Sequence, residues 1–304
     1  MITIRPMTPA DIPLGMRLKE AAGWNQSETD WRRHLELEPE GCFVGCCDDT
    51  PAATLAVTVF DGDTSTDKVA TRPSAWIAMV LTDPAFRRRG LANALLEHGI
   101  AYAESRGTAS IWLDATEMGR PVYEKLGFAT VFGLTRRRGI VRSVPGDSCD
   151  APLRVMTAED LAGGEVDDLD LAATGADRLK LLTALRRDLP EGALVAMRDP
   201  REVTALLGFA LARRGSRAVQ VGPVIARTEA IGRALLAAEF AQLAGSEALI
   251  DIPDDNVAAI EVAEAAGLTR ERSFYRMVRK STAGDATLGN VEPALWVSAG
   301  PEFG

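Results

Sequence analysis

The sequence has 304 residues, of which 46% are hydrophobic and 25% charged, so it is long enough to bury the cores of two ordinary domains. The formal net charge of -9 disfavours a nucleic-acid partner, because neutralising phosphates requires a basic face. No apolar run approaches the ~20 residues that cross a bilayer, and the N-terminus lacks a basic-then-apolar signal. We expect a globular cytoplasmic protein with neither a nucleic-acid nor a membrane partner.

Cysteine and histidine are too sparse to suggest a metal centre. Three of the four cysteines, Cys42, Cys46 and Cys47, fall in one short segment without the paired spacing of a zinc site. The only histidines are His34 and His98, which gives a histidine-based triad little support. We expect buried or half-buried free thiols and no metal.

The first half of the chain reads as an α/β domain around a mixed sheet. Strands are predicted where β-branched and apolar residues cluster, and helices where apolar residues recur at helical spacing. In chain order the sequence predicts a strand at 2–5, helices at 9–22 and 29–37, strands at 43–47, 52–60 and 75–82, a helix at 90–106, a strand at 109–114, a helix at 118–126 and strands within 128–142.

The second half repeats this plan. Residues 4–12 recur as residues 153–161, and each copy reads as a short strand followed by a helix capped by threonine. The repeat predicts a strand at 153–155, helices at 158–172 and 177–188, strands at 193–198, 203–212 and 217–225, a helix at 229–244, a strand at 247–252, a helix at 255–266 and a strand at 270–279.

The predicted fold class is α/β, with two tandem domains that each contain a mixed β-sheet flanked by helices. We expect the domains at 1–143 and 150–282, joined by the polar Pro/Gly stretch at 143–148. The tail at 283–304 has no periodicity, and Trp296 and Phe303 are expected to anchor it onto a domain surface.

A basic glycine loop leads from the strand at 75–82 into the helix that follows. It reads Phe86-Arg87-Arg88-Arg89-Gly90-Leu91-Ala92. The amides and positive dipole end of a helix N-terminus favour an anion, and Gly90 allows close approach because it has no Cβ. From the loop alone, a phosphate site and an exposed basic turn both remain open.

The order of strand, loop, helix, strand and helix resembles the GNAT superfamily of N-acetyltransferases. The loop pattern of that family, Gln/Arg-x-x-Gly-x-Gly/Ala, is met by Arg87, Gly90 and Ala92. The family also commonly presents a tyrosine just before a Leu-Gly-Phe corner, and Tyr123 meets this pattern. The resemblance covers essentially all of the first domain and implies acetyl-CoA as the cofactor.

The resemblance also implies which residues bind acetyl-CoA. Backbone groups of Met79, Val80 and Leu81 would pair with the pantetheine arm as if it were an added strand. The pyrophosphate would be held by amides of the loop and first helical turn: Arg87, Arg88, Arg89, Gly90, Leu91, Ala92 and Asn93.

The turn after the strand at 109–114 would approach the cofactor through Thr116, Gly119 and Arg120, although the asparagine that many relatives carry there is absent. Tyr123 would contact the cofactor and act as the catalytic acid. A phenol with a pKa near ~10 can hydrogen-bond a thiolate whose conjugate acid lies near ~8.5.

The acceptor side is expected in the early helices and the turn between them. Trp24 and Asn25 combine an aromatic ring and an amide that can frame a small polar amine. The general base stays unassigned, because nothing in the sequence ranks Asp83, Asp114 and Glu117.

The second copy lacks the chemical groups of the first. Ala230 stands where the first copy has Gly90, Thr228 and Glu229 replace two of the arginines, and Ala263 replaces the tyrosine. A carboxylate beside a phosphate opposes binding, and alanine cannot donate a proton. We expect this degenerate domain to support the first, to close over its acceptor pocket or to mediate formation of a homodimer.

The leading interpretation is an acetyl-CoA-dependent N-acetyltransferase whose first domain transfers an acetyl group to a primary amine of a small molecule by direct attack. Two alternatives remain open at this point. One is a non-catalytic acyl-CoA sensor. The other is acetylation of a protein lysine or N-terminus, which predicts an open groove on the acceptor side.

Overall fold

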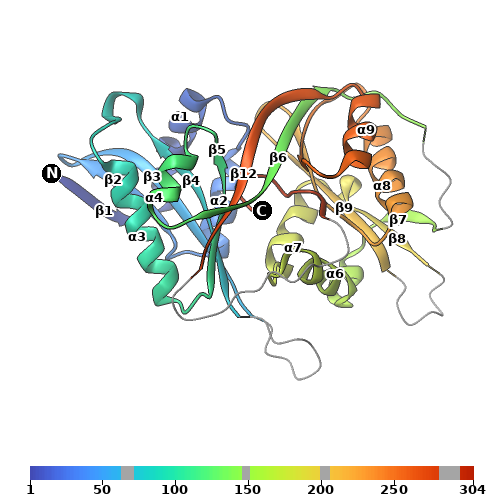
Figure 1. Cartoon of the computed structure of the whole chain (residues 1–304), viewed down its shortest axis with the longest axis horizontal. Coiled ribbons are helices and arrows are strands. Elements are labelled where there is room, and N and C mark those ends of the chain that lie inside the picture. The colour runs from blue at the N-terminus through green and yellow to red at the C-terminus, as the bar shows by residue number, and fades with distance from the viewer. Residues whose placement is uncertain (63–71, 146–150, 199–205, 281–294) are drawn as a thin grey trace. The chain divides into compact units, whose positions relative to one another are not determined.

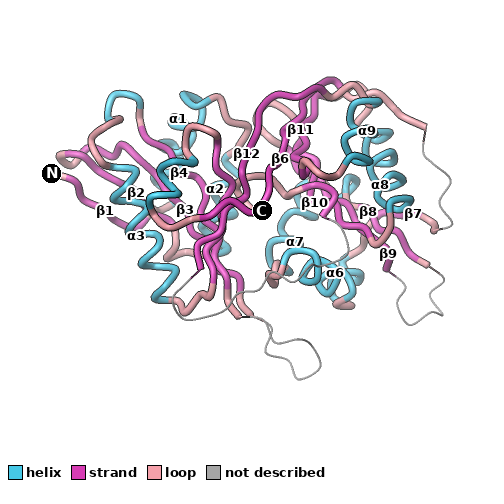
Figure 2. The backbone as a smooth tube through the Cα atoms, viewed as in Figure 1, coloured by secondary structure: helices cyan, strands magenta, loops and turns pink. Residues whose placement is uncertain are grey.

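The computed structural model describes residues 1–62, 72–145, 151–198, 206–280 and 295–304 (Figure 2). The described chain forms two compact units. Unit 1 contains Met1–Val131 together with 276–280 and Pro301–Gly304, and unit 2 contains Phe132–Tyr275 together with 295–300, each without its undescribed residues. The predicted linker extends beyond the described residues at 146–148, as does most of the tail at 283–294.

Unit 1 is a sheet in the order β1-β2-β3-β4-β5 with helices on both faces. Figure 1 shows α3 in front of the strands and α1 and α2 behind them. Gly99 lets α3 lie directly on Leu55 and Val57 of β3. The elements are β1 (Ile2–Pro6), α1 (Ile12–Ala22), α2 (Glu28–Leu37), β2 (Cys42–Cys47), β3 (Thr50–Phe60), β4 (Ser74–Thr82), α3 (Leu91–Ser105), β5 (Ser110–Thr116) and α4 (Arg120–Lys125).

Unit 2 repeats the plan around the strand order β11-β10-β9-β8-β7. Its core combines apolar side chains of these strands with those of α8 and α9. The elements are β7 (Leu153–Val155), α5 (Ala158–Ala162), α6 (Glu165–Thr174), α7 (Leu179–Asp188), β8 (Leu194–Met197), β9 (Leu206–Arg214), β10 (Val219–Ala226), α8 (Glu229–Gln242), β11 (Glu247–Pro253), α9 (Val257–Ala265) and β13 (Leu295–Val297).

The last long strand of each half completes the sheet of the other unit. From Leu134 to Ile140, β6 (Ala129–Ile140) pairs antiparallel with β11 of unit 2. The strand β12 (Thr269–Lys280) is the neighbour of β5, and its residues 276–280 belong to unit 1. The strands predicted within 128–142 and at 270–279 are therefore present, but each is divided between the two units.

A buried Arg–Asp pair holds each exchanged strand. In unit 1, Arg276 of β12 donates two hydrogen bonds to Asp114 of β5, at 2.8 and 2.9 Å. In unit 2, Arg136 of β6 binds Asp251 of β11 in the same two-pronged way, at 2.8 and 2.7 Å. Each guanidinium also lies over an aromatic ring of its own unit, Trp76 or Phe274. Both halves therefore contain the Arg–Asp pair as well as the exchanged strand.

The start of each half shows the same repeat at atomic detail. The Asp11 carboxylate accepts from the Thr8 amide at 2.9 Å and pairs with Arg5, whereas Asp160 accepts from the Thr157 amide at 2.6 Å and pairs with Arg154. Both arrangements are capping boxes, which satisfy amides that a helix start leaves unpaired. The internal repeat read from the sequence is confirmed.

Three details differ from the expected elements. The helix predicted at 9–22 begins as a short 3-10 turn, and the helix predicted at 158–172 is interrupted at Gly163–Gly164. The tail contains a strand, β13, which the sequence did not indicate. Trp296 and Phe303 are both buried, as expected, and so are the three cysteines Cys42, Cys46 and Cys47, which are free thiols.

Within the described ranges, no helix is long and apolar enough to cross a membrane. Those same ranges contain no cluster of histidine, cysteine and carboxylate side chains that can hold a metal ion.

Glu239 is a buried acid inside the core of unit 2. It lies on α8 with 0% of its surface exposed, and neither carboxylate oxygen has a hydrogen-bond partner among the described residues. Loss of water raises its pKa from 4.5 to about 8, so the folded protein holds it protonated at neutral pH.

The stability of the protein should therefore fall as the pH rises from about 5 to 8, because the folded state binds a proton that the unfolded state has released. Glu239→Gln removes this titration. Urea unfolding of both proteins at pH 5 and pH 8 measures the effect. The free energy of unfolding should fall more between these two pH values for the wild type than for the variant, by an extra amount that approaches about 1.4 kcal/mol for each pH unit. Equal losses would contradict the buried, protonated state of Glu239.

Candidate functional site

An opening between two parallel strands defines the candidate site of unit 1. The strands β4 and β5 pair at three positions, from Ser74↔Ser110 to Trp76↔Trp112, and then separate. Beyond the last pair, β4 continues to Thr82 and β5 to Thr116. Ligands of open α/β sheets bind near the carboxyl ends of such strands, and every residue predicted to bind the cofactor follows the last paired position of β4 or β5.

The β4 side of the opening carries a local irregularity at Met79. This residue has a positive φ of 55°, which is uncommon outside glycine, and the pairing of β3 with β4 shifts register between Thr54 and Ala56. The Thr54 hydroxyl donates to the Met79 carbonyl at 2.9 Å and so fixes the bend. Met79 and Leu81 are buried and Val80 is half-buried.

The loop after β4 leaves a row of backbone donors without acceptors. None of the amides from Arg87 to Asn93 donates to a described residue. Gly90 is the N-cap of α3 with a φ of 86°, and no side chain caps this helix start. An ideal Cβ on Gly90 would meet only Ile2, at 3.6 Å. Free amides at a helix N-terminus form a site for an anion.

The three loop arginines contribute charge in two ways. Arg89 lies over the Phe86 ring and donates to the Cys47 sulfur at 3.9 Å. Arg87 and Arg88 are exposed and form no ion pair within the part of the chain that the structure describes. Their guanidinium groups are available to a phosphate.

At the end of β5, the turn brings Thr116, Gly119 and Tyr123 together. The Gly119 amide donates to the Thr116 hydroxyl at 3.2 Å. A Cβ on Gly119 would lie 3.3 Å from the Tyr123 ring, so the absent side chain lets the ring lie against the turn. Arg120 pairs with Glu124 one turn later, at 2.7 Å. Thr116, Gly119 and Arg120 are half-buried.

The Tyr123 side chain is half-buried and packs edge-on against Phe128, with ring centroids 5.9 Å apart. Its hydroxyl has no hydrogen-bond partner in the described chain. Burial raises the pKa of Tyr123 to about 12. The hydroxyl therefore keeps its proton throughout the neutral range and can act as a donor.

Two of the three carboxylates near the opening are already engaged. Asp114 is the buried partner of Arg276. Asp83 pairs with Arg17, which together with the Ala85 amide lowers the pKa of that carboxyl. A paired carboxylate makes a poor base, whereas Glu117 is exposed. The pairs rank Asp83 and Asp114 behind Glu117, a distinction that the sequence did not provide.

The predicted acceptor residues lie in the turn between α1 and α2. Gly23 ends α1 with a φ of 70°, the Trp24 amide donates to the Lys19 carbonyl at 2.9 Å, and Asn25 is buried. Trp24 is half-buried.

The tail contacts unit 1 through Phe303, which was expected to anchor it onto a domain surface, although the sequence did not indicate which surface. Phe303 stacks on His34 of α2 with centroids 4.7 Å apart, and Arg33 lies over the same ring at 5.3 Å. Trp76 donates to the Pro301 carbonyl at 3.0 Å.

The corresponding loop of unit 2 is built differently. The Thr228 hydroxyl accepts from the Ile231 amide at 3.4 Å, so the start of α8 is capped, and Glu229 adds a negative charge to its first turn. Arg233 is neutralised by Glu229 and Glu261, at 2.7 and 2.6 Å. This end of α8 is therefore poorly suited to an anion.

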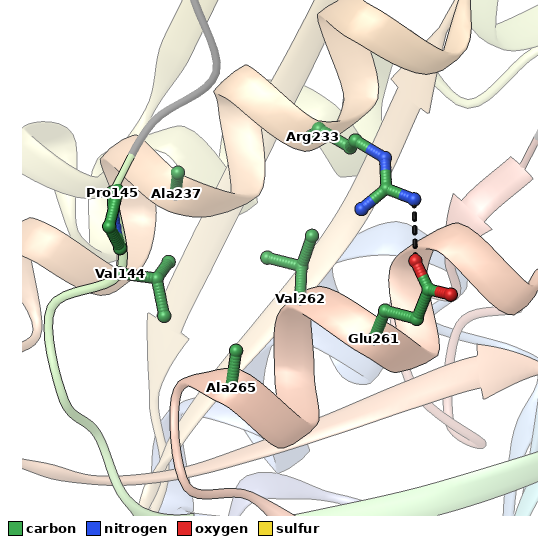
Figure 3. Close-up of a pocket in the computed structure, with 7 residues that line it drawn as sticks. All are labelled: Val144, Pro145, Arg233, Ala237, Glu261, Val262 and Ala265. Atoms are coloured by element: carbon green, nitrogen blue, oxygen red, sulfur yellow. Dashed lines mark hydrogen bonds and ion pairs between the residues drawn. The ribbon is translucent and has the colours of Figure 1, made fainter.

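A pocket of about 340 Å³ lies beside α8 and α9 of unit 2 (Figure 3). Arg233 and Glu261 form an ion pair at one edge, and the remaining lining is apolar apart from main chain. Its lining residues are Val144, Pro145, Arg233, Ala237, Glu261, Val262 and Ala265. None of them is a residue that the sequence singled out, and the pocket adds no reactive group to the site of unit 1.

Two family models match the chain. Residues 15–128 match the acetyltransferase (GNAT) family, and residues 166–288 match an acetyltransferase (GNAT) domain. The chain is a tandem GNAT acyltransferase. Both the family resemblance and the mixed α/β fold expected from the sequence are confirmed.

Named relatives of this GNAT protein include acyltransferases and N-acetyltransferases. It is 25% identical over 263 residues to holothin acyltransferase of Pseudoalteromonas sp., covering 85% of this chain and 81% of that protein. It is 29% identical over 185 residues to the uncharacterized N-acetyltransferase YitH of Bacillus subtilis, covering 59% and 61%. The ribosomal protein bS18-alanine N-acetyltransferase of Escherichia coli is 42% identical over 52 residues, covering 16% and 35%.

Solved structures share the tandem fold. A putative acetyltransferase of Pyrococcus horikoshii has a TM-score of 0.76 at 21% identity, covering 100% of this chain and 96% of that one. A tandem GNAT protein from the clavulanic acid biosynthesis pathway has a TM-score of 0.59 at 17% identity, covering 94% and 100%.

The Asp114–Arg276 pair should be strongly coupled, because removing one partner leaves the other charge buried. Asp114→Asn should lower the free energy of unfolding by about 3–5 kcal/mol. Adding Arg276→Met should restore part of that loss, and urea unfolding measures all four members of the cycle. Asp251→Asn is the matched control in unit 2 and should cost a similar amount. Strictly additive effects of Asp114→Asn and Arg276→Met would show that the pair is not coupled.

Proposed function

We propose that this GNAT protein transfers an acetyl group from acetyl-CoA to a primary amine of a small molecule, with unit 1 as the active unit and Tyr123 as the general acid. The observation that carries this proposal is the unsatisfied row of amides from Arg87 to Asn93, beside the opening between β4 and β5. The Asp114–Arg276 pair and the bend at Met79 fix the two sides of that opening.

The residues of unit 1 fit acetyl-CoA in three respects. The diphosphate would meet uncapped amides and two unpaired arginines. The pantetheine arm would lie along the backbone of Met79, Val80 and Leu81, where β4 no longer pairs with β5. Thr116, Gly119 and Arg120 would border the cofactor on the β5 side, next to Tyr123.

Acetyl-CoA, when bound, would supply the thioester carbon that the neutral amine attacks directly. As the C–N bond forms and the C–S bond breaks, the electron pair of the C–S bond leaves on sulfur, and the Tyr123 hydroxyl donates its proton there. The proton lost by nitrogen returns to the phenolate through water. Burial raises the pKa of Tyr123 to about 12. The same loss of water would raise the pKa of the CoA thiol, which limits the difference between the two pKa values.

The acceptor side favours a small amine over a protein substrate. Asn25 and Gln26 are buried and Trp24 is half-buried, which suits a small amine better than a long peptide. The buried Gln26 Oε1 has no hydrogen-bond partner among the described residues, and an amine N–H can supply one. Trp24 and Asn25 would frame the amine.

The relative with the larger shared length is not one that is named for a protein substrate. Holothin acyltransferase matches over 85% of this chain, whereas the enzymes named for an alanine of a ribosomal protein match over 16% of it for Escherichia coli and 42% for Salmonella typhimurium.

Gly90→Val should weaken CoA binding by about ten-fold or more, because a branched side chain is strained at a positive φ and intrudes on the phosphate position. Gly107→Val is the matched control, since Gly107 also has a positive φ, of 74°, but follows the other end of α3. Isothermal titration with CoA measures both. Wild-type affinity in Gly90→Val, or an equal loss in both variants, would remove the proposed phosphate site.

Tyr123→Phe should lower kcat by about ten-fold or more with little change in the affinity for acetyl-CoA, because the ring still packs on Phe128 but cannot donate a proton. A thiol-release assay across a panel of small amines measures this. Unchanged turnover would exclude Tyr123 as the acid. Tight acyl-CoA binding without thiol release from any amine or peptide would favour the sensor instead.

A further inference from the structure

The strand β13 lies in the opening of unit 2 that corresponds to the candidate site of unit 1. In unit 2, β10 and β11 also pair in parallel at three positions, ending at Val221↔Ile250, and then separate. Beyond that pair, β13 pairs antiparallel with β10, at Val224↔Val297 and Ile225↔Leu295. The Ser298 amide donates to the Asp251 carbonyl of β11 at 2.9 Å. The segment therefore binds both sides of the opening.

The register identifies what β13 replaces. The pairing of β9 with β10 shifts register between Val221 and Val224, as the pairing of β3 with β4 does between Ala78 and Leu81, and each bulge contains a residue with positive φ, Gly222 or Met79. Val224 therefore corresponds to Leu81, one of the positions proposed to pair with pantetheine. The equivalence of the positions comes from the strand pairing alone. Only the identity of pantetheine as the ligand of unit 1 rests on the proposed function.

Two glycines fit the segment closely. A Cβ on Gly222 of β10 would overlap the Ser298 carbonyl, so the backbones approach more closely than any side chain would allow. A Cβ on Gly232 would overlap the Trp296 ring, which therefore covers the first turn of α8. In unit 1 the equivalent helix start is uncapped and has free amides. Trp296, Val297 and Ser298 are all buried.

We propose that the opening between β10 and β11 is a peptide-binding groove whose occupant is the chain's own segment 295–299. The segment takes the place of the pantetheine arm, and Trp296 takes the place next to the diphosphate. The backbone of the segment pairs with the backbone that lines the groove. Such main-chain pairing is open to any sequence whose side chains fit the groove. One chain then binds one CoA, in unit 1, and CoA does not displace the segment.

The binding stoichiometry of the full chain tests this directly. Isothermal titration with CoA should give one equivalent per chain, and a second equivalent would overturn the proposal. Hydrogen exchange should show that amides at 296–298 stay equally protected with and without saturating CoA, while amides at 87–93 gain protection. Exchange that becomes about ten-fold faster at 296–298 with CoA would mean that the ligand displaces the segment.

A double-mutant cycle tests the contact that closes the groove. Gly232→Ala should speed hydrogen exchange at 296–298 by about ten-fold or more, because the methyl group meets the indole ring. Trp296→Ala should also speed it, by removing packing. The double variant should be less affected than the product of the two single effects, since the new methyl occupies space that the ring has left. Independent, multiplicative effects would contradict the packing of Trp296 on the start of α8.

Discussion

Two parallel strands that pair over three positions and then separate leave backbone donors and acceptors that need partners. Buried polar backbone is rarely left unsatisfied, so each such opening suits an extended partner. In unit 2 the chain supplies it, as β13 between β10 and β11. In unit 1 the geometry from β4 to α3 leaves amides free at a helix start, which is the arrangement that suits a diphosphate with an extended arm. The opening of unit 2 is thus filled by the chain itself, whereas we propose that a bound ligand fills the opening of unit 1.

The exchange of strands explains why the two halves keep the same buried ion pair. A strand that joins the sheet of the other unit pairs with a strand that is distant in the sequence, so no short turn sets its register. A bidentate Arg–Asp pair fixes both its register and its position. In unit 1 this bond engages Asp114, directly on the strand that borders the candidate site. The Asp114–Arg276 pair therefore positions the β5 side of the opening. Because the Asp114 carboxylate is engaged in this pair, it is a weak candidate for the general base.

The sequence predicted what depends on short-range patterns. The loop from Arg87 to Ala92, the turn before Tyr123 and the loss of both in the second copy are local features, and local spacing was enough to find them. It did not predict the strand exchange, because Arg276 and Asp114 are 162 positions apart and either sheet satisfies the same alternating pattern. It also missed β13, since Leu295-Trp296-Val297 is too short for a period and its edge partners are not encoded nearby.

The account treats one half as a working acyltransferase site and the other as a groove that the chain fills itself. A crystal structure of the full chain with CoA tests this most directly. The account predicts a single CoA, with its diphosphate at the amides of 87–93, its thiol end near Tyr123, and β13 unmoved between β10 and β11. A diphosphate bound elsewhere, or a CoA lying between β10 and β11 in place of β13, would contradict it.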